Sequence, residues 1–549
     1  MGVTSHRDLV AGEVEPIRQR VRALFANLEA AFPRMPIVVL SSLAEGGDQL
    51  VAEEALDAGL RLVAALPLAR AEYARDFSDA AALSRFESLC EAARIIEVPH
   101  RSDAVPASPE GHARDVRYAE AGVYVSDHCH LLLAIWDGKP SASLGGTAQI
   151  VRYHLDGVRP TEQHRNGRRH ALGFGSDRLA YHLVASRGRP DGAPLASLHA
   201  LDAHWRTGDA ISSAEAGMPD AFRAMFACAD AFNLDAAKYA SDIDARAAPD
   251  ASGGAIDRLF RAADWLAMHF QRRVLLAMRV LYTVAALMAI AFTVYDNVPA
   301  QDNMLYVFLL LFVVGGYIVT LANRRGWHRK YLDYRALAEG LRVQSYWRRA
   351  GLALTDDAEF GRDNFLQKQD VELGWVRNVM RSAALEDGGG TRAPQAVTEV
   401  VADWIGDDER QGQLEYYRRK AAQRARTHRV TEAIGLASLC AGIGISVVLA
   451  IFARHLSGDA KNVLVIVMAV FSILAGVRAA YAYKKADKEL IKQYRYMQRI
   501  FDQARIALRS ATDAREQREI LRLLGEAALA EQVEWALMHR QRPLEHNRI

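Results

Sequence analysis

The chain reads MLYVFLLLFVVGGYIVTLA from Met304 to Ala322, without a charged side chain. A second uncharged stretch, AIGLASLCAGIGISVVLAIFA, runs from Ala433 to Ala453. A bilayer core about 30 Å thick is crossed by about 20 apolar helical residues, so both stretches are long enough to span it. Because helices in the core of a soluble protein rarely run this far without a polar face, we expect both to be membrane spans.

Each of these two spans has a less regular apolar neighbour. Leu275–Val294 precedes the first and carries Arg279. Val463–Val477 follows the second and reaches full length when Arg478 snorkels and the span extends to Tyr483. We therefore expect four transmembrane helices in two hairpins. No Asp or Glu lies within a span, so the pattern does not indicate a proton relay or an ion-coupled transporter.

The distribution of basic residues predicts the topology. Lys and Arg cluster on the outer flanks of the two hairpins, at 271–273, 323–330, 418–429 and 484–485. The connectors within the hairpins hold only Arg454 and Lys461. By the positive-inside rule, both termini and the middle segment face the cytoplasm. The two hairpins, each followed by a charged amphipathic helix, resemble a duplicated two-span unit.

Two helix-packing patterns in the membrane half do not show whether their partner lies in the same chain or in another copy. Ser438, Gly442 and Ser446 lie on one face of the third span, which favours close helix packing within one chain or between copies. A heptad seam follows the fourth span, at Leu490, Tyr494, Met497, Phe501, Ala504 and Leu508. This seam packs inside the monomer or joins subunits.

Composition narrows the class of protein. The formal net charge is +2, so no bulk field favours nucleic acid, and we expect no nucleic-acid partner. The four cysteines are scattered without CxxC spacing, which suits a reducing compartment. The run Asp127-His128-Cys129-His130 offers metal-type atoms, but strand alternation points Cys129 away from the histidines, and we expect no metal site. The basic run His164–His170 is predicted to be a solvated loop, or a loop that steers an anionic ligand.

The first 190 residues alternate between strand and helix patterns. Apolar runs at 36–40, 61–66, 95–98 and 130–136 predict strands, with helical patterns between them. We expect a Rossmann-like parallel sheet with helices on both faces, followed by an all-α membrane region with four transmembrane helices and long cytoplasmic helices. The expected order is this domain (1–190), a connecting region (191–255), a first two-span module (256–384), a linker (385–400) and a second module (401–549).

Two glycine-containing loops follow strands of this domain. Gly46, Gly47 and Asp48 come after the strand at 36–40, and Gly145, Gly146 and Thr147 come after the strand at 130–136. Glycine lets backbone approach a ligand, Thr147 can cap a helix, and free N–H groups at a helix start favour phosphate. Ligands of open α/β sheets bind at the carboxyl ends of strands, where we expect the loops to meet. Neither loop matches a Walker A or GxGxxG motif.

Several motifs carry a family resemblance. The N-terminal half resembles the SLOG domain through GVTSHRD at 2–8, SSLAEGGD at 41–48, LPL and YARDF within 66–77, WDGKP at 136–140 and GGTA at 145–148. SLOG is a Rossmann-like superfamily that includes cytokinin-activating phosphoribohydrolases and nucleotide sensors of bacterial conflict systems. The membrane half resembles SLATT, a two-helix membrane effector found beside SLOG domains, and its ending at 529–545 is similar to that family's C-terminal helix.

The resemblance implies a sensor fused to a membrane effector, located in the bacterial inner membrane. A nucleotide-derived ligand, and no resident cofactor, would bind the sensor, and a homo-oligomer would then assemble or open a pore, in antiphage defence. Arg7 would pair with phosphate, Asp48 would accept from ribose hydroxyls or cap its helix, and His6 would be a ligand contact or a structural histidine. The implied pocket consists of Gly2, Thr4, Ser5, His6, Arg7, Gly46, Gly47, Asp48, Gly145, Gly146 and Thr147.

One difference between this chain and the phosphoribohydrolases of the SLOG superfamily favours ligand binding over catalysis. The phosphoribohydrolases carry a glutamate three residues after the Gly-Thr of their phosphate loop, and Ile150 stands there in this chain. Without that carboxylate, hydrolysis of a glycosidic bond has no evident catalyst. We therefore expect no enzymatic activity. The alternatives are a membrane-tethered nucleotide or N-glycosidic hydrolase, and an oligomeric channel that is open without ligand.

Overall fold

The computed structural model describes residues 1–77, 79–99, 109–158, 160, 178–246, 254–298, 301–352, 365–366, 371–387, 395–407, 409–452 and 454–540. They form two compact units, Met1–Leu259 with Glu359–Arg392 and Phe260–Ala358 with Ala393–Ile549. The predicted basic loop at 164–170, residues 388–394 of the predicted linker and the last residues of the SLATT-like ending lie outside the described residues.

The first unit is built on an eight-stranded sheet in the order β4-β3-β2-β1-β5-β6-β7-β8. From β4 to β6 the neighbouring strands are parallel, and β7 and β8 add an antiparallel edge. The strands are β1 (Gly2–Ser5), β2 (Val38–Ser41), β3 (Arg61–Leu66), β4 (Arg94–Glu97), β5 (Leu132–Trp136), β6 (Ala180–Val184), β7 (Ala203–Arg206) and β8 (Ile211–Ser213). The predicted α/β class is thus confirmed.

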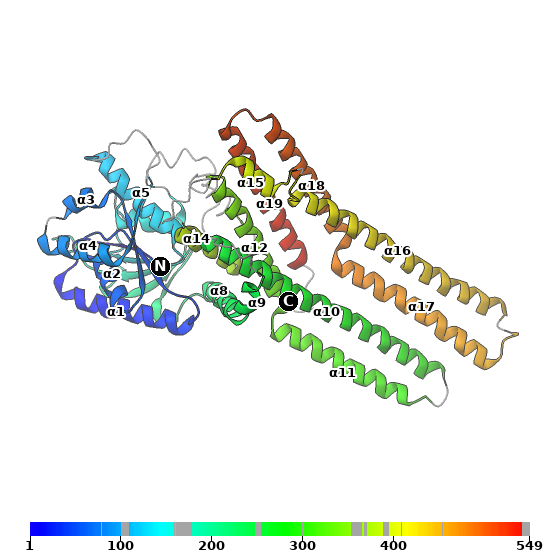
Figure 1. Cartoon of the computed structure of the whole chain (residues 1–549). Helices are drawn as coiled ribbons and strands as arrows, with labels where there is room; N and C mark the ends of the chain where they lie inside the picture. Colours follow the sequence, from blue (N-terminus) through cyan, green and yellow to red (C-terminus); the bar gives the residue numbers. More distant parts are fainter. Residues whose placement is uncertain are drawn as a thin grey trace. The chain divides into compact units, whose positions relative to one another are not determined.

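Helices cover both faces of this sheet (Figure 1). One layer contains α1 (Ala11–Ala31), α2 (Gly47–Asp57) and α4 (Ala80–Ala92), and the other contains α5 (His112–His128) and α6 (Thr147–Asp156). All five residues of β5 are buried, as expected for a parallel strand covered on both sides. Leu132, Ala134 and Trp136 enter the core under α5 and α6, so this strand anchors the centre of the domain.

The strand order reverses beside β1. From β1 the chain winds outward to β4 and then crosses back to β5, which pairs with β1 on its other side. Ser5 lies opposite Ile135, so the carboxyl ends of β1 and β5 open at the same place. In open α/β sheets such a topological switch point is where ligands bind.

The first unit extends beyond the predicted domain. The stretch 191–255, predicted as a connecting region, contributes β7, β8, α8 (Asp220–Lys238) and α9 (Ala240–Asp244). The short α3 (Arg70–Tyr73) follows β3, and α14 (Gly374–Asp387), predicted within the first membrane module, also belongs to this unit. The backbone carbonyl of Asn378 on α14 lies 2.7 Å from Nε2 of His130, next to β5. The predicted boundaries at 190 and 384 therefore do not separate the two units.

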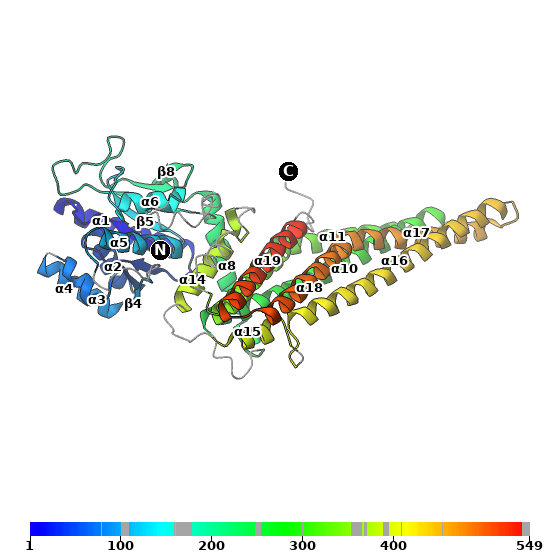
Figure 2. The same ribbon diagram turned by 90° about the horizontal axis from the view of Figure 1, so that it is seen from above.

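The second unit is all helical. Its elements are α10 (Ala255–Asn297, which begins in the first unit), α11 (Asn303–Arg324), α12 (Trp327–Arg349), α15 (Val397–Trp404), α16 (Gln413–Phe452), α17 (Gly458–Lys485), α18 (Asp487–Ser510) and α19 (Ala514–Arg540). The long helices form the hairpins α10–α11 and α16–α17 (Figures 1 and 2). Among the described residues, four helices are long and apolar enough, by length and composition, to cross a membrane. They expose large apolar side chains such as Leu310 (64 %) and Ile451 (65 %), which suits contact with lipid.

The small-residue stripe on α16 and the heptad seam on α18 both find packing partners within this unit. The hydroxyl of Ser446 donates to the sulfur of Met468 on α17 at 2.9 Å, and a Cβ at Gly442 would lie 3.4 Å from Oγ of Ser472. The seam on α18 is also buried, with the ring of Phe501 5.4 Å from that of Tyr417 on α16. The small-residue stripe and the heptad seam therefore pack inside one chain.

Candidate functional site

The three predicted loops converge at the carboxyl end of β1. The backbone N–H of Gly47, at the start of α2, donates to the carbonyl of His6 at 3.2 Å. The hydroxyl of Thr147, at the start of α6, donates to the carbonyl of Ser5 at 2.7 Å. The first turns of both helices thus meet the end of one strand, and we call this place the crevice.

Glycines allow this approach. A Cβ at Gly46, whose φ is +89°, would lie 2.3 Å from the carbonyl oxygen of Arg7. A Cβ at Gly47 would lie 2.6 Å from Cβ of Ser5. Gly145 makes its close approach to a different element, since a Cβ there would lie 2.7 Å from the backbone nitrogen of Ala119 on α5. Gly46 and Gly47 therefore shape the crevice, whereas Gly145 lets the loop before α6 pack on α5.

Asp48 lies in the floor of the crevice. Its carboxylate accepts hydrogen bonds from the hydroxyls of Ser5 at 2.6 Å and Ser41 at 3.2 Å. Because it bonds to β1 and β2 instead of its own helix start, the predicted capping role is not the one observed. Burial raises the pKa of this carboxyl to about 6, although the two hydroxyls and Arg7 act in the opposite direction.

This shifted pKa predicts a pH-dependent stability. Between the usual pKa of 3.8 and about 6, the folded state binds more protons at Asp48 than the unfolded state does, so stability falls as pH rises through that window. Across the whole window the free energy of unfolding falls by about 3 kcal/mol. We expect Asp48→Asn to remove this decline. As pH rises from 4 to 7, the melting temperature of the variant should therefore increase relative to that of the wild type. Asp57→Asn, at an exposed position of the same helix, should keep the wild-type profile; equal profiles for all three proteins would refute the assignment.

Arg7 is the exposed cation of the crevice. Its guanidinium carbon lies 5.5 Å from the ring centroid of Tyr118, and it forms no ion pair with a described residue. The Tyr118 hydroxyl donates to Asp76, whose charge is balanced by Arg114 at 2.7 Å. Arg7 is therefore held over an aromatic ring with its charge available to an anion.

Tyr73 begins the YARDF motif but is not among the residues predicted for the pocket. Its side chain is almost fully buried (2 % exposed), and burial raises the pKa of the phenol well above its usual range. Its ring centroid lies 6.2 Å from that of Tyr118, the ring that Arg7 also contacts. The Tyr73 hydroxyl has no hydrogen-bond partner among the residues that the structure describes. A hydroxyl without a protein partner can donate to a bound anion.

The start of α6 supplies further donors. Gly146 is the N-cap residue, with extended backbone and no side-chain cap. The Thr147 hydroxyl is committed to Ser5, so the predicted capping by Thr147 is wrong. The N–H groups of Thr147 and Ala148 have no partner within the described ranges, and the helix dipole favours negative charge at this end.

The remaining residues predicted for the pocket offer fewer groups to a ligand in the crevice. Nε2 of His6 lies 3.2 Å from Oδ1 of Asp137, and burial lowers the pKa of the ring, which favours a neutral structural histidine with Nδ1 left for a ligand. Thr4 lies within β1 opposite Ala134. Gly2 stands at the other end of β1, where a Cβ would lie 2.9 Å from Sγ of Cys129, and it is not brought together with the other predicted residues.

The position expected to hold a catalytic glutamate is apolar. Ile150 is 1 % exposed, and a Cβ at Gly122 on α5 would lie 2.4 Å from its Cδ1. The groups that do gather in the crevice are a cation, an unpartnered hydroxyl and helix-start N–H donors, which suit binding of an anion. Searches against protein-family models, curated proteins and solved structures find no match for the chain.

Proposed function

We propose that the chain is a membrane effector whose first unit senses a nucleotide-derived ligand and whose second unit responds by opening or assembling a pore. The observation that carries the sensing half is the crevice, where Arg7 and Tyr73 both lie against the ring of Tyr118 and the start of α6 is bonded to Ser5 at the switch point of a Rossmann-like sheet. Phosphate is the ligand group that suits these donors. The resemblance to SLOG and SLATT supports the same reading, including a homo-oligomer in the bacterial inner membrane and a role in antiphage defence.

A continuous helix supports the coupling half of the proposal. The carboxylate of Asp387, at the end of α14, accepts from the N–H groups of Ala255 at 2.5 Å and Ile256 at 3.1 Å, the first residues of α10. From there α10 runs unbroken to Asn297 through the first apolar span. Since α14 is also bonded next to β5, a displacement at β5 would reach the first turn of α10, the helix that continues into the first apolar span.

The binding half is tested by thermal stabilisation of the detergent-purified protein. The panel consists of linear nucleotides, cyclic dinucleotides, ADP-ribose and NAD. Ligand that binds only the folded protein at 100 times its Kd adds about 2.7 kcal/mol, which is a shift of several degrees. A shift with at least one member supports the proposal. No shift with any member would favour the ligand-independent channel.

Asp387→Ala tests the coupling half. Removing the cap at the start of α10 should cost about 1 kcal/mol, because two N–H groups lose their acceptor. We expect nucleotide-induced stabilisation to persist, while nucleotide-dependent dye release from liposomes falls several-fold. Glu386→Ala changes the neighbouring acidic side chain, which pairs with Arg61 and not with α10, and serves as the control. Equal release from wild type and Asp387→Ala would exclude this route.

A further inference from the structure

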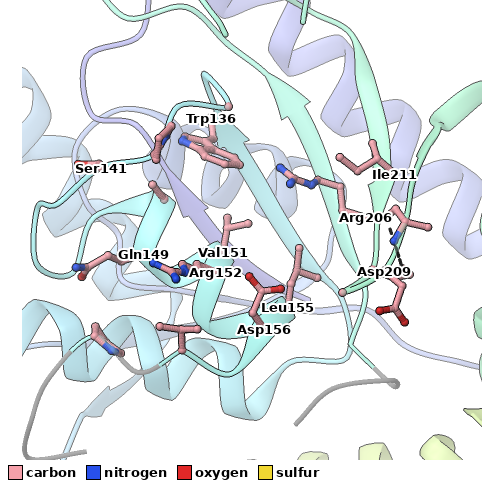
Figure 3. Close-up of a pocket in the computed structure, with 18 of the residues that line it drawn as sticks. Trp136, Ser141, Gln149, Val151, Arg152, Leu155, Asp156, Arg206, Asp209 and Ile211 are labelled. Atoms are coloured by element: carbon pink, nitrogen blue, oxygen red, sulfur yellow. Dashed lines mark hydrogen bonds between the residues drawn. The ribbon is translucent and has the colours of Figure 1, made fainter. Parts of the chain in front are cut away.

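A second hollow of the first unit borders the crevice and shares Ala148, at the start of α6, with it. It is a cavity of about 900 Å³ between α6 and the loop that joins β7 to β8 (Figure 3). None of the eleven residues predicted for the pocket lines it. Ligand cavities of drug-sized molecules span about 300–1,000 Å³, so this one has room for an organic ligand.

Two cations border this cavity. Arg206, from β7, lies with its guanidinium carbon 5.4 Å from the ring centroid of Trp136, and its Nε is buried without a hydrogen-bond partner. Arg152 projects from α6 on the opposite wall. Neither arginine forms an ion pair with a described residue. A partly buried guanidinium without a counter-ion favours an anionic ligand group.

The rest of the lining is of two other kinds. Val151 and Leu155 are buried apolar residues of α6, and Ile211 on the facing wall is 59 % exposed. Asp156 and Asp209 add carboxylates near the rim, with no partner among the described residues. Apolar walls suit a flat or apolar body, and carboxylates accept from hydroxyl groups.

We infer that this cavity is a second ligand site, for a nucleoside monophosphate or an aromatic phosphate of that size. The phosphate lies between Arg206 and Arg152, the base lies on Val151, Leu155 and Ile211, and the ribose hydroxyls donate to Asp156 or Asp209. This inference does not rest on the function proposed for the crevice, since the two arginines that carry it, Arg206 and Arg152, are not crevice residues.

Photo-labelling locates the site directly. The full-length protein is irradiated with 8-azido-AMP, and the adducts are mapped by peptide mass spectrometry. We expect adducts within 149–156 or 206–211, suppressed by excess AMP. Labelling confined to the crevice peptides 1–8, 41–49 and 70–77, or no labelling that AMP suppresses, would overturn the inference.

Variants assign the phosphate contact. Arg206→Gln and Arg152→Gln should each lower labelling of the cavity peptides at least tenfold, whereas Gly146→Asp in the crevice should leave it unchanged. Arg152 is exposed, so its substitution leaves the fold intact even where loss of Arg206 disturbs Trp136. Undiminished labelling of the cavity peptides in a well-folded Arg152→Gln protein and in Arg206→Gln would contradict the assignment. Adducts in the cavity peptides without adducts in the crevice peptides would support this second site. The same result would contradict the sensing function proposed for the crevice.

Discussion

Gly146→Asp is expected to abolish nucleotide binding at the crevice while leaving the protein as stable as the wild type. Gly146 is the N-cap of α6, with φ −72° and ψ 159°, a backbone conformation that aspartate adopts readily. The new carboxylate would accept from the N–H of Ala148, which helps the helix and occupies the donors that we assign to phosphate. Its charge would also repel an anionic ligand. We expect at least a 100-fold loss of affinity, since like charges at a binding site cost several kcal/mol.

Gly146→Asn is the matched control for this result. Asparagine caps a helix nearly as well as aspartate does, but it adds no charge. The nearest atom to a new Cβ, the carbonyl oxygen of Ser143 at 3.2 Å, is the same for both substitutions. We therefore expect Gly146→Asn to retain about a tenth of the wild-type affinity in the same thermal-shift titration. An aspartate variant that is stabilised by nucleotide as strongly as the wild type would show that α6 does not hold the ligand.

Gly46→Ala is expected to cause the largest structural damage of any single methyl group at the crevice. The residue sits at φ +89°, and its Cβ would lie 2.3 Å from the carbonyl oxygen of Arg7. Backbone strain alone costs about 1 kcal/mol, and the clash forces the start of α2 away from β1. We expect a total cost of about 3 kcal/mol or more, seen as a lower melting temperature and faster hydrogen exchange in peptides covering the start of α2.

Gly59→Ala separates strain from clash. Gly59 follows the same helix with φ +71°, but nothing lies within 4 Å of its Cβ. This variant should show only the strain, about 1 kcal/mol, and should keep nucleotide binding. Equal effects of the two alanines would mean that the contact between α2 and β1 does not matter for the crevice.

The parts of the site that could be predicted are those set by local sequence. A short apolar run followed by a glycine loop and a helix places the loop at the carboxyl end of a strand, whatever the rest of the chain does. For this reason the sequence predicts loops beside β1, where Gly46 and Gly47 approach the end of that strand. The position of Asp48 was also foreseeable, but its bonds to Ser5 and Ser41 depend on the pairing of β1 with β2.

The missed residues depend on tertiary packing. Tyr73 and Tyr118 project from α3 and α5, and only the crossing of these helices over the strand ends brings them to Arg7. The edge strands β7 and β8 are four and three residues long, too short for a reliable alternation of apolar and polar residues. α14 lies more than 200 residues from β5 in sequence, and its bond to His130 has no local signal.

Dye release from liposomes that contain the full-length protein tests the central claim most directly. Wild type and Gly146→Asp are reconstituted side by side, and each member of the nucleotide panel is added in turn. We predict that a nucleotide which stabilises the wild type also triggers release from its liposomes, and that Gly146→Asp liposomes stay sealed with the same compound. Release that is the same with and without nucleotide, or the same in both proteins, would contradict the account.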